Sequence, residues 1–179
     1  MVKLNAAQLR AGTVISDKQK VKRNEIYIIL DNVLDTYNIG SVFRLADAVA
    51  AKKVYLCKGS ATPPNHRIKK ASINTTEWVE WEYCEDTIGA IRKIREIEPN
   101  VQVVAVEQSE RSVLYDQFEY KLPIALVVGH ETEGVSQEVL DLCDATVELP
   151  MLGVNISLNV VVSLGIVLYK VVSQNELSH

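Results

Sequence analysis

Three groups of residues in this chain have types and spacing that could do chemistry. In the first group, Asn38, Gly40 and Arg44 follow a short apolar run. A guanidinium one helical turn beyond a glycine could stabilise an oxyanion or hold a phosphate through two parallel hydrogen bonds. The same pattern is also typical of a capped helix, with Asn38 as the cap and one surface arginine. The residues alone leave both interpretations open.

The second group is the glycine-containing segment Gly129-His-Glu-Thr-Glu-Gly134-Val-Ser136. It approaches the phosphate-binding motif Gly-x4-Gly-Lys-Ser/Thr, but Val135 stands where the lysine is required. The carboxylates of Glu131 and Glu133 would repel phosphates, and no Gly-x-Gly-x-x-Gly fingerprint occurs anywhere in the chain. The segment therefore favours a ligand that is cationic or lacks phosphate, or else it is an ordinary turn between a strand and a helix.

The third group lies between Leu149 and Asn159. Leu149, Met151 and Leu158 would form apolar walls with Ser157 and Asn159 as polar tips, which suits a flat adenine ring better than a sugar phosphate. Helix capping, by Asn155 and Ser157, and core packing would explain the same residues without any ligand.

The C-terminal helix that follows is apolar on nearly every side. Val160, Leu164, Val167, Leu168 and Val171 recur at helical spacing and define one buried stripe. Further apolar residues occupy the opposite side, among them Val162 and Tyr169. Such a helix must be covered both by its own core and by a second copy of the chain, so we expect a homodimer.

Strands alternate with helices along the rest of the chain, which predicts an α/β fold with a mostly parallel sheet and helices on both faces. The expected strands are Glu25–Leu30, Lys53–Cys57, Glu77–Tyr83 at an edge, Val101–Val106, Ile124–Val128 and Ala145–Leu149. The expected helices before the last one are Ile39–Ala51, Arg67–Ser72, Asp86–Ile97 and Ser136–Cys143. Ligands of such sheets bind beyond the carboxyl ends of the strands, where four segments fall: Asp31-Asn32, Glu107, Gly129–Glu131 and Pro150-Met151.

Length and composition predict one domain, with a short helix and basic linker over residues 1–23 and a catalytic core over residues 24–173. Of the 179 residues, 47% are hydrophobic and 23% are charged, as in ordinary globular proteins. Three scattered cysteines and three scattered histidines predict neither a disulfide frame nor a metal site. We expect a cytoplasmic protein, because the start lacks a signal peptide and the last helix is short of the roughly 20 apolar residues that span a bilayer.

The net charge of −4 argues weakly against a protein that binds nucleic acid, but the charge is uneven. Basic residues cluster at Lys18–Arg23 and again at His66–Lys70. A local basic patch is enough for phosphate contacts, although either cluster could equally be a solvated surface.

Taken in order, the three groups resemble the three motifs of the SpoU (TrmH-type) RNA ribose methyltransferases of the SPOUT superfamily. The matching segments are Asn38-x-Gly40-x-x-x-Arg44, Gly129-x-Glu131-x-x-Gly134 and Leu149-Pro-Met-x-Gly153-x-x-x-Ser157-Leu-Asn159. The resemblance extends over residues 25–172. It implies a C-terminal trefoil knot, a homodimer, S-adenosylmethionine as cofactor, and methyl transfer to a ribose 2′-hydroxyl of tRNA or rRNA. The chain departs from the family pattern in two places: it has Asp35–Tyr37 where relatives often carry proline, and Ala50-Ala51 where they often carry glycine.

The resemblance also assigns roles to single residues. Arg44 is similar to the catalytic arginine, with Asn38 positioning it, Glu131 as the acid of the second motif, and Ser157 and Asn159 as a polar pair that completes the site. The cofactor-binding residues that it implies are Gly129, Leu149, Met151, Gly153 and Leu158. A non-catalytic RNA-binding module with this fold is the main alternative, and a nucleotide-dependent oxidoreductase is disfavoured by the missing glycine fingerprint.

Overall fold

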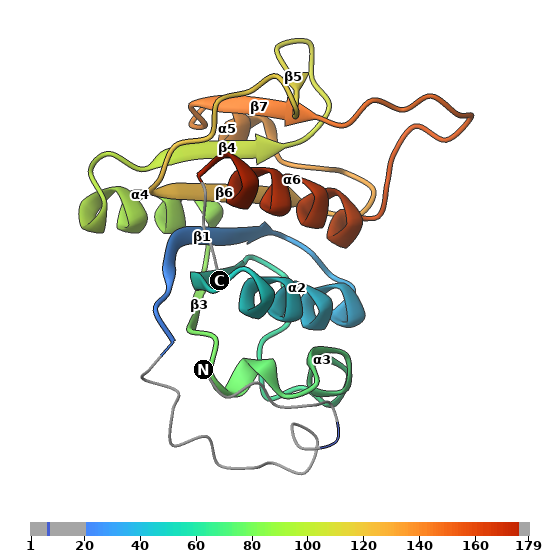
Figure 1. Cartoon of the computed structure of the whole chain (residues 1–179). Coiled ribbons are helices and arrows are strands. Elements are labelled where there is room, and N and C mark those ends of the chain that lie inside the picture. Colours follow the sequence, from blue (N-terminus) through green and yellow to red (C-terminus); the bar gives the residue numbers. More distant parts are fainter. Residues whose placement is uncertain (1–6, 8–20, 176–179) are drawn as a thin grey trace.

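Seven parallel strands form the central sheet of the computed structural model, which describes Ala7 and residues 21–175 (Figure 1). The strands are β1 (Asn24–Asp31), β2 (Ala51–Cys57), β3 (Trp81–Cys84), β4 (Gln102–Val106), β5 (Val113–Leu114), β6 (Ile124–Gly129) and β7 (Ala145–Glu148). Their order across the sheet is β3-β2-β1-β6-β4-β7-β5, and every pairing between them is parallel. The expected parallel α/β fold is confirmed, while most of the helix expected in residues 1–23 lies outside the described residues.

Helices cover both faces of the sheet. They are α2 (Thr36–Ala48), α3 (His66–Ser72), α4 (Thr87–Ile97), α5 (Gln137–Leu140) and α6 (Val160–Gln174). Helices α2, α3 and α6 share one apolar cluster and lie in front of the sheet in Figure 1, whereas α4 and α5 share a second cluster on the opposite face. This arrangement brings the carboxyl ends of all the central strands to the same edge.

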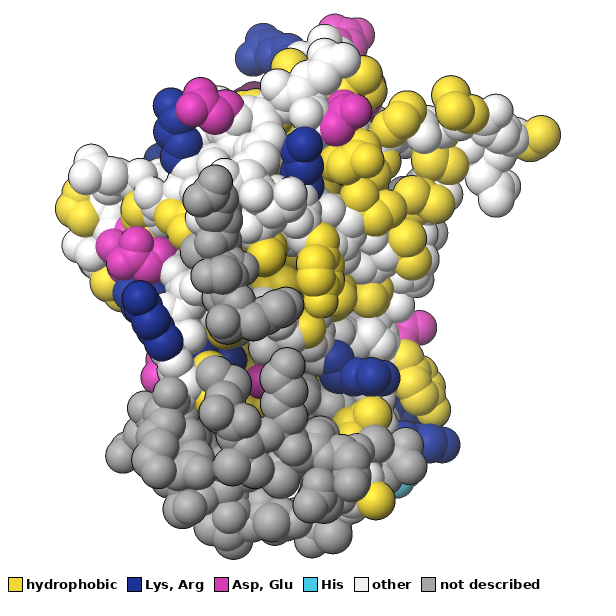
Figure 2. Space-filling view, in the orientation of Figure 1, with side chains coloured by type: hydrophobic (Ala, Val, Ile, Leu, Met, Phe, Trp, Pro, Cys, Tyr) yellow, Lys and Arg dark blue, Asp and Glu magenta, His cyan; other side chains and the backbone are white. Residues whose placement is uncertain are grey.

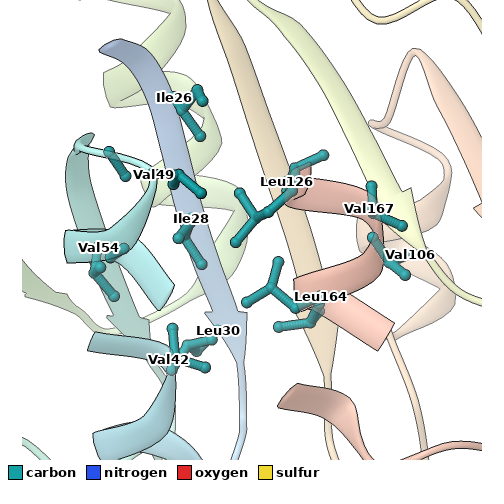
Figure 3. Packing of buried hydrophobic residues seen from close by; sticks show 14 of the residues in the cluster. Ile26, Ile28, Leu30, Val42, Val49, Val54, Val106, Leu126, Leu164 and Val167 are labelled. Carbon is teal, nitrogen blue, oxygen red and sulfur yellow. The ribbon is translucent and has the colours of Figure 1, made fainter. Parts of the chain in front are cut away.

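The central strand β1 shows why both faces must be covered. Ile26, Ile28 and Leu30 point into the cluster beneath α2 and α6, and Tyr27 and Ile29 point into the other cluster (Figure 3). All five side chains are buried. Successive side chains of a strand alternate between the faces of a sheet, so the continuous apolar run of residues 26–30 can be stable only where helices cover both faces.

Two local expectations on the first half of the chain are wrong. Asp35, and not Asn38, caps α2, because its Oδ1 accepts hydrogen bonds from the N–H groups of Tyr37 and Asn38 at 2.7 and 3.2 Å. The edge strand β3 begins at Trp81, later than expected, because residues 75–77 form a 3-10 turn that buries Val79. The two-residue strand β5 is too short to leave a periodic pattern in the sequence.

The last helix begins later than its apolar pattern indicates. Asn159 caps α6 by accepting a hydrogen bond at 2.9 Å from the N–H of Val161, so Asn155 and Ser157 are not caps. They lie in an extended arm of residues 150–158 that projects from the molecule between β7 and α6 (Figure 1). The predicted buried stripe is confirmed at Leu164, Val167, Leu168 and Val171. Within the described residues, no helix is long and apolar enough to cross a membrane.

Candidate functional site at the carboxyl ends of the strands

A pocket of about 560 Å³ opens where β4, β6 and β7 end. Its walls come from three segments: residues 106–108 after β4, the loop of residues 128–134 after β6, and parts of the segment 147–163 that precedes and begins α6. In a parallel sheet the carboxyl ends of neighbouring strands converge, and the loops that follow them form a natural binding crevice.

The loop of residues 129–136, called here the glycine loop, closes on itself at its base. The N–H of His130 donates to the carbonyl of Gly134 at 3.0 Å, and the N–H of Gly134 donates back to the carbonyl of His130 at 2.9 Å. A Cβ atom at Gly129 would overlap the backbone of Gly134 and Val135. Gly134 adopts a φ of 70°, which glycine tolerates best. The conformation of the loop therefore requires both glycines even without a ligand.

Two carboxylates hold the glycine loop from below. Glu107 accepts a hydrogen bond from the N–H of Val135 at 2.9 Å. Asp31, only 1% exposed, accepts hydrogen bonds from both the N–H and the hydroxyl of Ser136, each at 3.0 Å. Asp31 also accepts from Thr87 at 2.6 Å and pairs with Lys58 at 2.9 Å. The sequence placed both carboxylates at strand ends where ligands bind, but it did not show that they hold the glycine loop.

Thr87, Ser136 and Lys58 all donate to Asp31, and this affects its ionisation. Burial raises the pKa of the Asp31 carboxyl, but the hydrogen bonds from Thr87 and Ser136 and the ammonium of Lys58 outweigh burial. The pKa of Asp31 therefore lies below its ordinary value, and the carboxylate stays charged at neutral pH.

Glu131 joins the glycine loop to the start of α2. One of its oxygens accepts from the N–H of Asp35 and from the side-chain amide of Asn38, both at 3.0 Å, and the other accepts from the N–H of Leu34 at 3.2 Å. Burial raises the pKa of Glu131, but the hydrogen bonds from Asn38 and from backbone N–H groups lower it by more. The net shift of the pKa is therefore downward. A charged carboxylate beside the N-terminus of a helix is also favoured by the helix dipole.

Asn159 completes a polar chain across the rim of the pocket. Its side-chain N–H donates to the side-chain oxygen of Asn38 at 3.1 Å, while its own side-chain oxygen caps α6. Three of the predicted catalytic residues, Asn38, Glu131 and Asn159, are thus brought together from three separate segments of the chain. Ser157 lines the pocket close by.

Three predicted site residues, Arg44, Asn38 and Gly153, do not line the pocket, although Asn38 is tied to its rim by hydrogen bonds to Glu131 and Asn159. Arg44 is exposed on α2 and forms no ion pair within residues 21–175. Asn38 is bonded to Glu131 and Asn159 and not to Arg44. Gly153 is exposed on the arm, with no atom within 4 Å of where its Cβ would stand. The other predicted cofactor residues, Gly129, Leu149, Met151 and Leu158, line the pocket.

The charge of the pocket is one-sided. Its walls include Glu107, Glu131, Glu133 and Glu148, and within the described part of the chain no lysine or arginine lines it. Such a pocket attracts a cation and repels a phosphate, as the glycine loop alone predicted. The described residues contain no cluster of His, Cys, Asp or Glu side chains placed to hold a metal ion.

The fold and the site together define a parallel α/β domain with a carboxylate-rich ligand pocket between its strand-end loops. Residues 25–169 match the model of the SpoU rRNA Methylase family, and the chain belongs to that family.

Relatives of known name support this membership. The chain is 32% identical over 171 residues to the tRNA (guanosine(18)-2′-O)-methyltransferase of Aquifex aeolicus, covering 93% of this chain and 76% of that protein. The crystal structure of the A. aeolicus TrmH/SpoU tRNA modifying enzyme matches with a TM-score of 0.79 at 28% identity, covering 96% of this chain and 82% of that one.

A third relative is the AdoMet-bound rRNA methyltransferase of Sinorhizobium meliloti, with a TM-score of 0.77 at 28% identity. The match covers 89% of this chain and 61% of that one. The chain likewise spans 61% of the length of several curated relatives, which are longer proteins.

Proposed function

We propose that the protein is an S-adenosylmethionine-dependent methyltransferase that acts on a ribose 2′-hydroxyl of tRNA or rRNA. The observation that carries the proposal is the hydrogen-bonded set of Asn38, Glu131 and Asn159 at the rim of the pocket. The described walls of that pocket contain carboxylates and no lysine or arginine. The family and the activities for which the relatives are named support the same reaction.

The pocket suits the proposed cofactor in charge and in polarity. S-adenosylmethionine supplies a methyl group activated on a positively charged sulfonium. The glutamates of the pocket favour that charge, and Leu149, Met151 and Leu158 offer apolar contact to the adenine ring. The absence of a cationic phosphate cradle from the described walls disfavours NAD and ATP, which carry phosphates.

Arg44 is the proposed group that activates the hydroxyl. A ribose hydroxyl is a poor nucleophile near neutral pH, so its developing negative charge must be stabilised. The pKa of an arginine exceeds about 12, so its guanidinium acts as an electrostatic stabiliser and not as a base. The hydrogen-bonded set of Glu131, Asn38 and Asn159 keeps the rim rigid while the RNA is positioned.

A homodimer explains how Arg44 could act although it lies outside its own pocket. Leu152, Val154 and Ile156 on the arm are at least 82% exposed, and Val162 and Tyr169 on α6 are about half exposed. Figure 2 shows hydrophobic side chains along the projecting arm at the upper right. A second chain that covers this surface would place Arg44 of one chain at the pocket of its partner.

We further predict a trefoil knot, a single catalytic domain with an N-terminal helix, and a cytoplasmic location. The pattern of the family supports the knot, and a chain that modifies cellular RNA would work where that RNA is.

Calorimetry and methyl transfer test the proposed reaction. The protein should bind S-adenosylmethionine and not NAD, and it should transfer labelled methyl groups to RNA at sites that 2′-O-methylation mapping then identifies. Binding of RNA without binding of S-adenosylmethionine would favour the non-catalytic alternative instead.

Mixed dimers test whether Arg44 acts on the partner's pocket. Arg44→Ala and Glu131→Gln chains should each be inactive alone. Their equal mixture should regain about a quarter of wild-type activity, because half of the dimers are mixed and each contains one intact site. No recovery on mixing would show that both residues act within one chain.

A further inference from the structure

The short helix α3 carries an exposed cationic face that the proposed reaction has not yet used. His66, Arg67, Lys69 and Lys70 are exposed, whereas Ile68 and Ser72 are buried beneath them. The helix contains no acidic residue, and its three lysine and arginine side chains form no ion pair within residues 21–175.

Many other cations of the molecule are neutralised by a neighbour. Lys52, Lys53, Lys58, Lys93 and Lys121 each pair with a carboxylate. Within residues 21–175, eight lysines and arginines have no such partner. Three of them lie on α3 and Arg44 lies on the helix packed against it, whereas the other four are scattered along the chain: Lys22, Arg92, Arg111 and Lys170. Figure 2 shows Lys and Arg side chains at the lower right, over the region where α2 and α3 lie in Figure 1.

Close packing fixes α3 relative to the pocket rim. A Cβ at Gly40 of α2 would stand 2.6 Å from the Cβ of Ala71 and 2.7 Å from the carbonyl oxygen of Ile68, so the two helix backbones touch there. Asn38, two residues before this contact, is bonded to the rim residues Glu131 and Asn159. Arg44 lies one helical turn after Gly40 in the sequence, whereas Asn38 lies before it. The cationic face is therefore held in register with the site by rigid elements.

The pocket cannot hold the backbone of an RNA, because its glutamates would repel the phosphates. A protein of net charge −4 also needs a local cationic surface to bind a polyanion. We propose that the exposed cations of α3 bind the phosphate backbone of the RNA substrate and direct the target ribose to the pocket, while Arg44 acts on the target hydroxyl itself. This inference rests on the proposed function.

The salt dependence of RNA binding tests the inference. Phosphate contacts do not depend on sequence, so an unmodified tRNA transcript can serve as the probe. The Lys69→Gln/Lys70→Gln variant should bind it about tenfold more weakly at 0.1 M salt, and the slope of log K against log salt should flatten by about 1.5. The matched control is Arg92→Gln/Lys121→Gln, which removes the same charge from two exposed positions outside α3 and should change affinity less than twofold.

Kinetics and cofactor binding separate this inference from the function on which it rests. In the α3 variant the affinity for S-adenosylmethionine and the turnover at saturating RNA should be unchanged, while KM for RNA rises, because phosphate contacts bind the ground state and the transition state equally. Equal weakening in the α3 variant and its control would overturn the inference and leave the methyltransferase intact. A wild-type protein that binds no RNA would overturn both. If the α3 variant bound RNA like the wild type but no longer bound phosphatidylserine vesicles, the surface would be assigned to a membrane. That result would also overturn the inference.

Discussion

The glycine loop and the arm of residues 150–158 border the same pocket, yet they are held in opposite ways. The glycine loop is fastened by Asp31, Glu107 and Glu131, and its base is closed by paired backbone hydrogen bonds. The arm makes one hydrogen bond in the described part of the chain, from the side chain of Gln108 to the carbonyl oxygen of Ile156 at 2.7 Å. The side chains of Leu152, Val154 and Ile156 at its tip are directed to solvent.

This difference separates two kinds of site residue. Residues around the glycine loop are organised by one chain alone, so their positions do not depend on a ligand or partner. Residues on the arm have few internal contacts, and their final positions depend on what covers them. Four pairs of variants can break or sharpen the comparison.

The largest difference should come from two glycine substitutions. Gly129→Ala forces a methyl group into the backbone of Gly134 and should lower the free energy of unfolding by at least about 3 kcal/mol. Gly153→Ala meets no atom within 4 Å and should change the same quantity by less than about 0.5 kcal/mol. Urea unfolding measures both, and equal effects would contradict the proposed difference between loop and arm.

The anchor beneath the loop should give the next largest effect. Asp31→Asn turns an amide N–H toward groups that are themselves donors, and it should cost about 2 to 3 kcal/mol of unfolding free energy at pH 7. Ser109→Ala, in the segment after β4, is the control for a lost exposed hydrogen bond.

The same carboxylate predicts a pH dependence. Because the pKa of folded Asp31 is lowered, its contribution is complete above the ordinary aspartate pKa of about 4 and is lost as the pH falls through the lower folded value. Wild type and Asp31→Asn should therefore converge in stability below pH 4. A constant gap down to pH 2 would show that the charge of Asp31 is not what stabilises the loop.

The rim carboxylate should affect catalysis more than stability. Glu131→Gln leaves one oxygen for three donors and should lower turnover at least about a hundredfold, with about 1 to 2 kcal/mol lost from unfolding. Glu133→Gln changes the same charge two residues away and should retain most activity. Single-turnover methyl transfer compares the two, and similar losses in both would point to pocket charge instead of the hydrogen bonds of Glu131.

The arm should give the smallest effect on the folded chain and a distinct effect on assembly. Val154→Ser/Ile156→Ser alters side chains that are 101% and 82% exposed, so unfolding should change by less than about 0.5 kcal/mol. Sedimentation should show at least a tenfold weaker dimer. Ile97→Ser, at an exposed position on α4, is the matched control and should leave the dimer unchanged. An unaffected dimer in the arm variant would place the interface elsewhere.

The sequence predicted the sheet better than it predicted the site. Strands such as β1 and β6 are continuous apolar runs, and these leave a clear pattern because burial on both faces excludes polar residues. Helix ends were less predictable. Both Asp35 and Asn38 are good caps by type, and only the backbone shows that Asp35 has the extended conformation of a cap.

Within the site, residue types indicated the chemistry but not the connections. Glu131 was assigned an acid's role, yet nothing in the sequence shows that it binds α2, because residues 35 and 131 meet only through the pairing of β1 with β6. Asp31 and Glu107 were placed correctly at strand ends, but their hydrogen bonds to the glycine loop could not be predicted for the same reason. Arg44 and Gly153 match the family motifs, but neither lines the pocket of the described chain.

The closed base of the glycine loop makes its tip a convenient place for an optical reporter. Thr132 and Glu133 are exposed at the mouth of the pocket, and the base stays fixed without them. Burial raises the pKa of both the Cys57 and the Cys143 thiols to about 12 and raises that of Cys84 as well, so the native cysteines are poor nucleophiles at neutral pH. A dye attached through Glu133→Cys would thus label one position, and its fluorescence would follow the entry and exit of molecules at the pocket in real time.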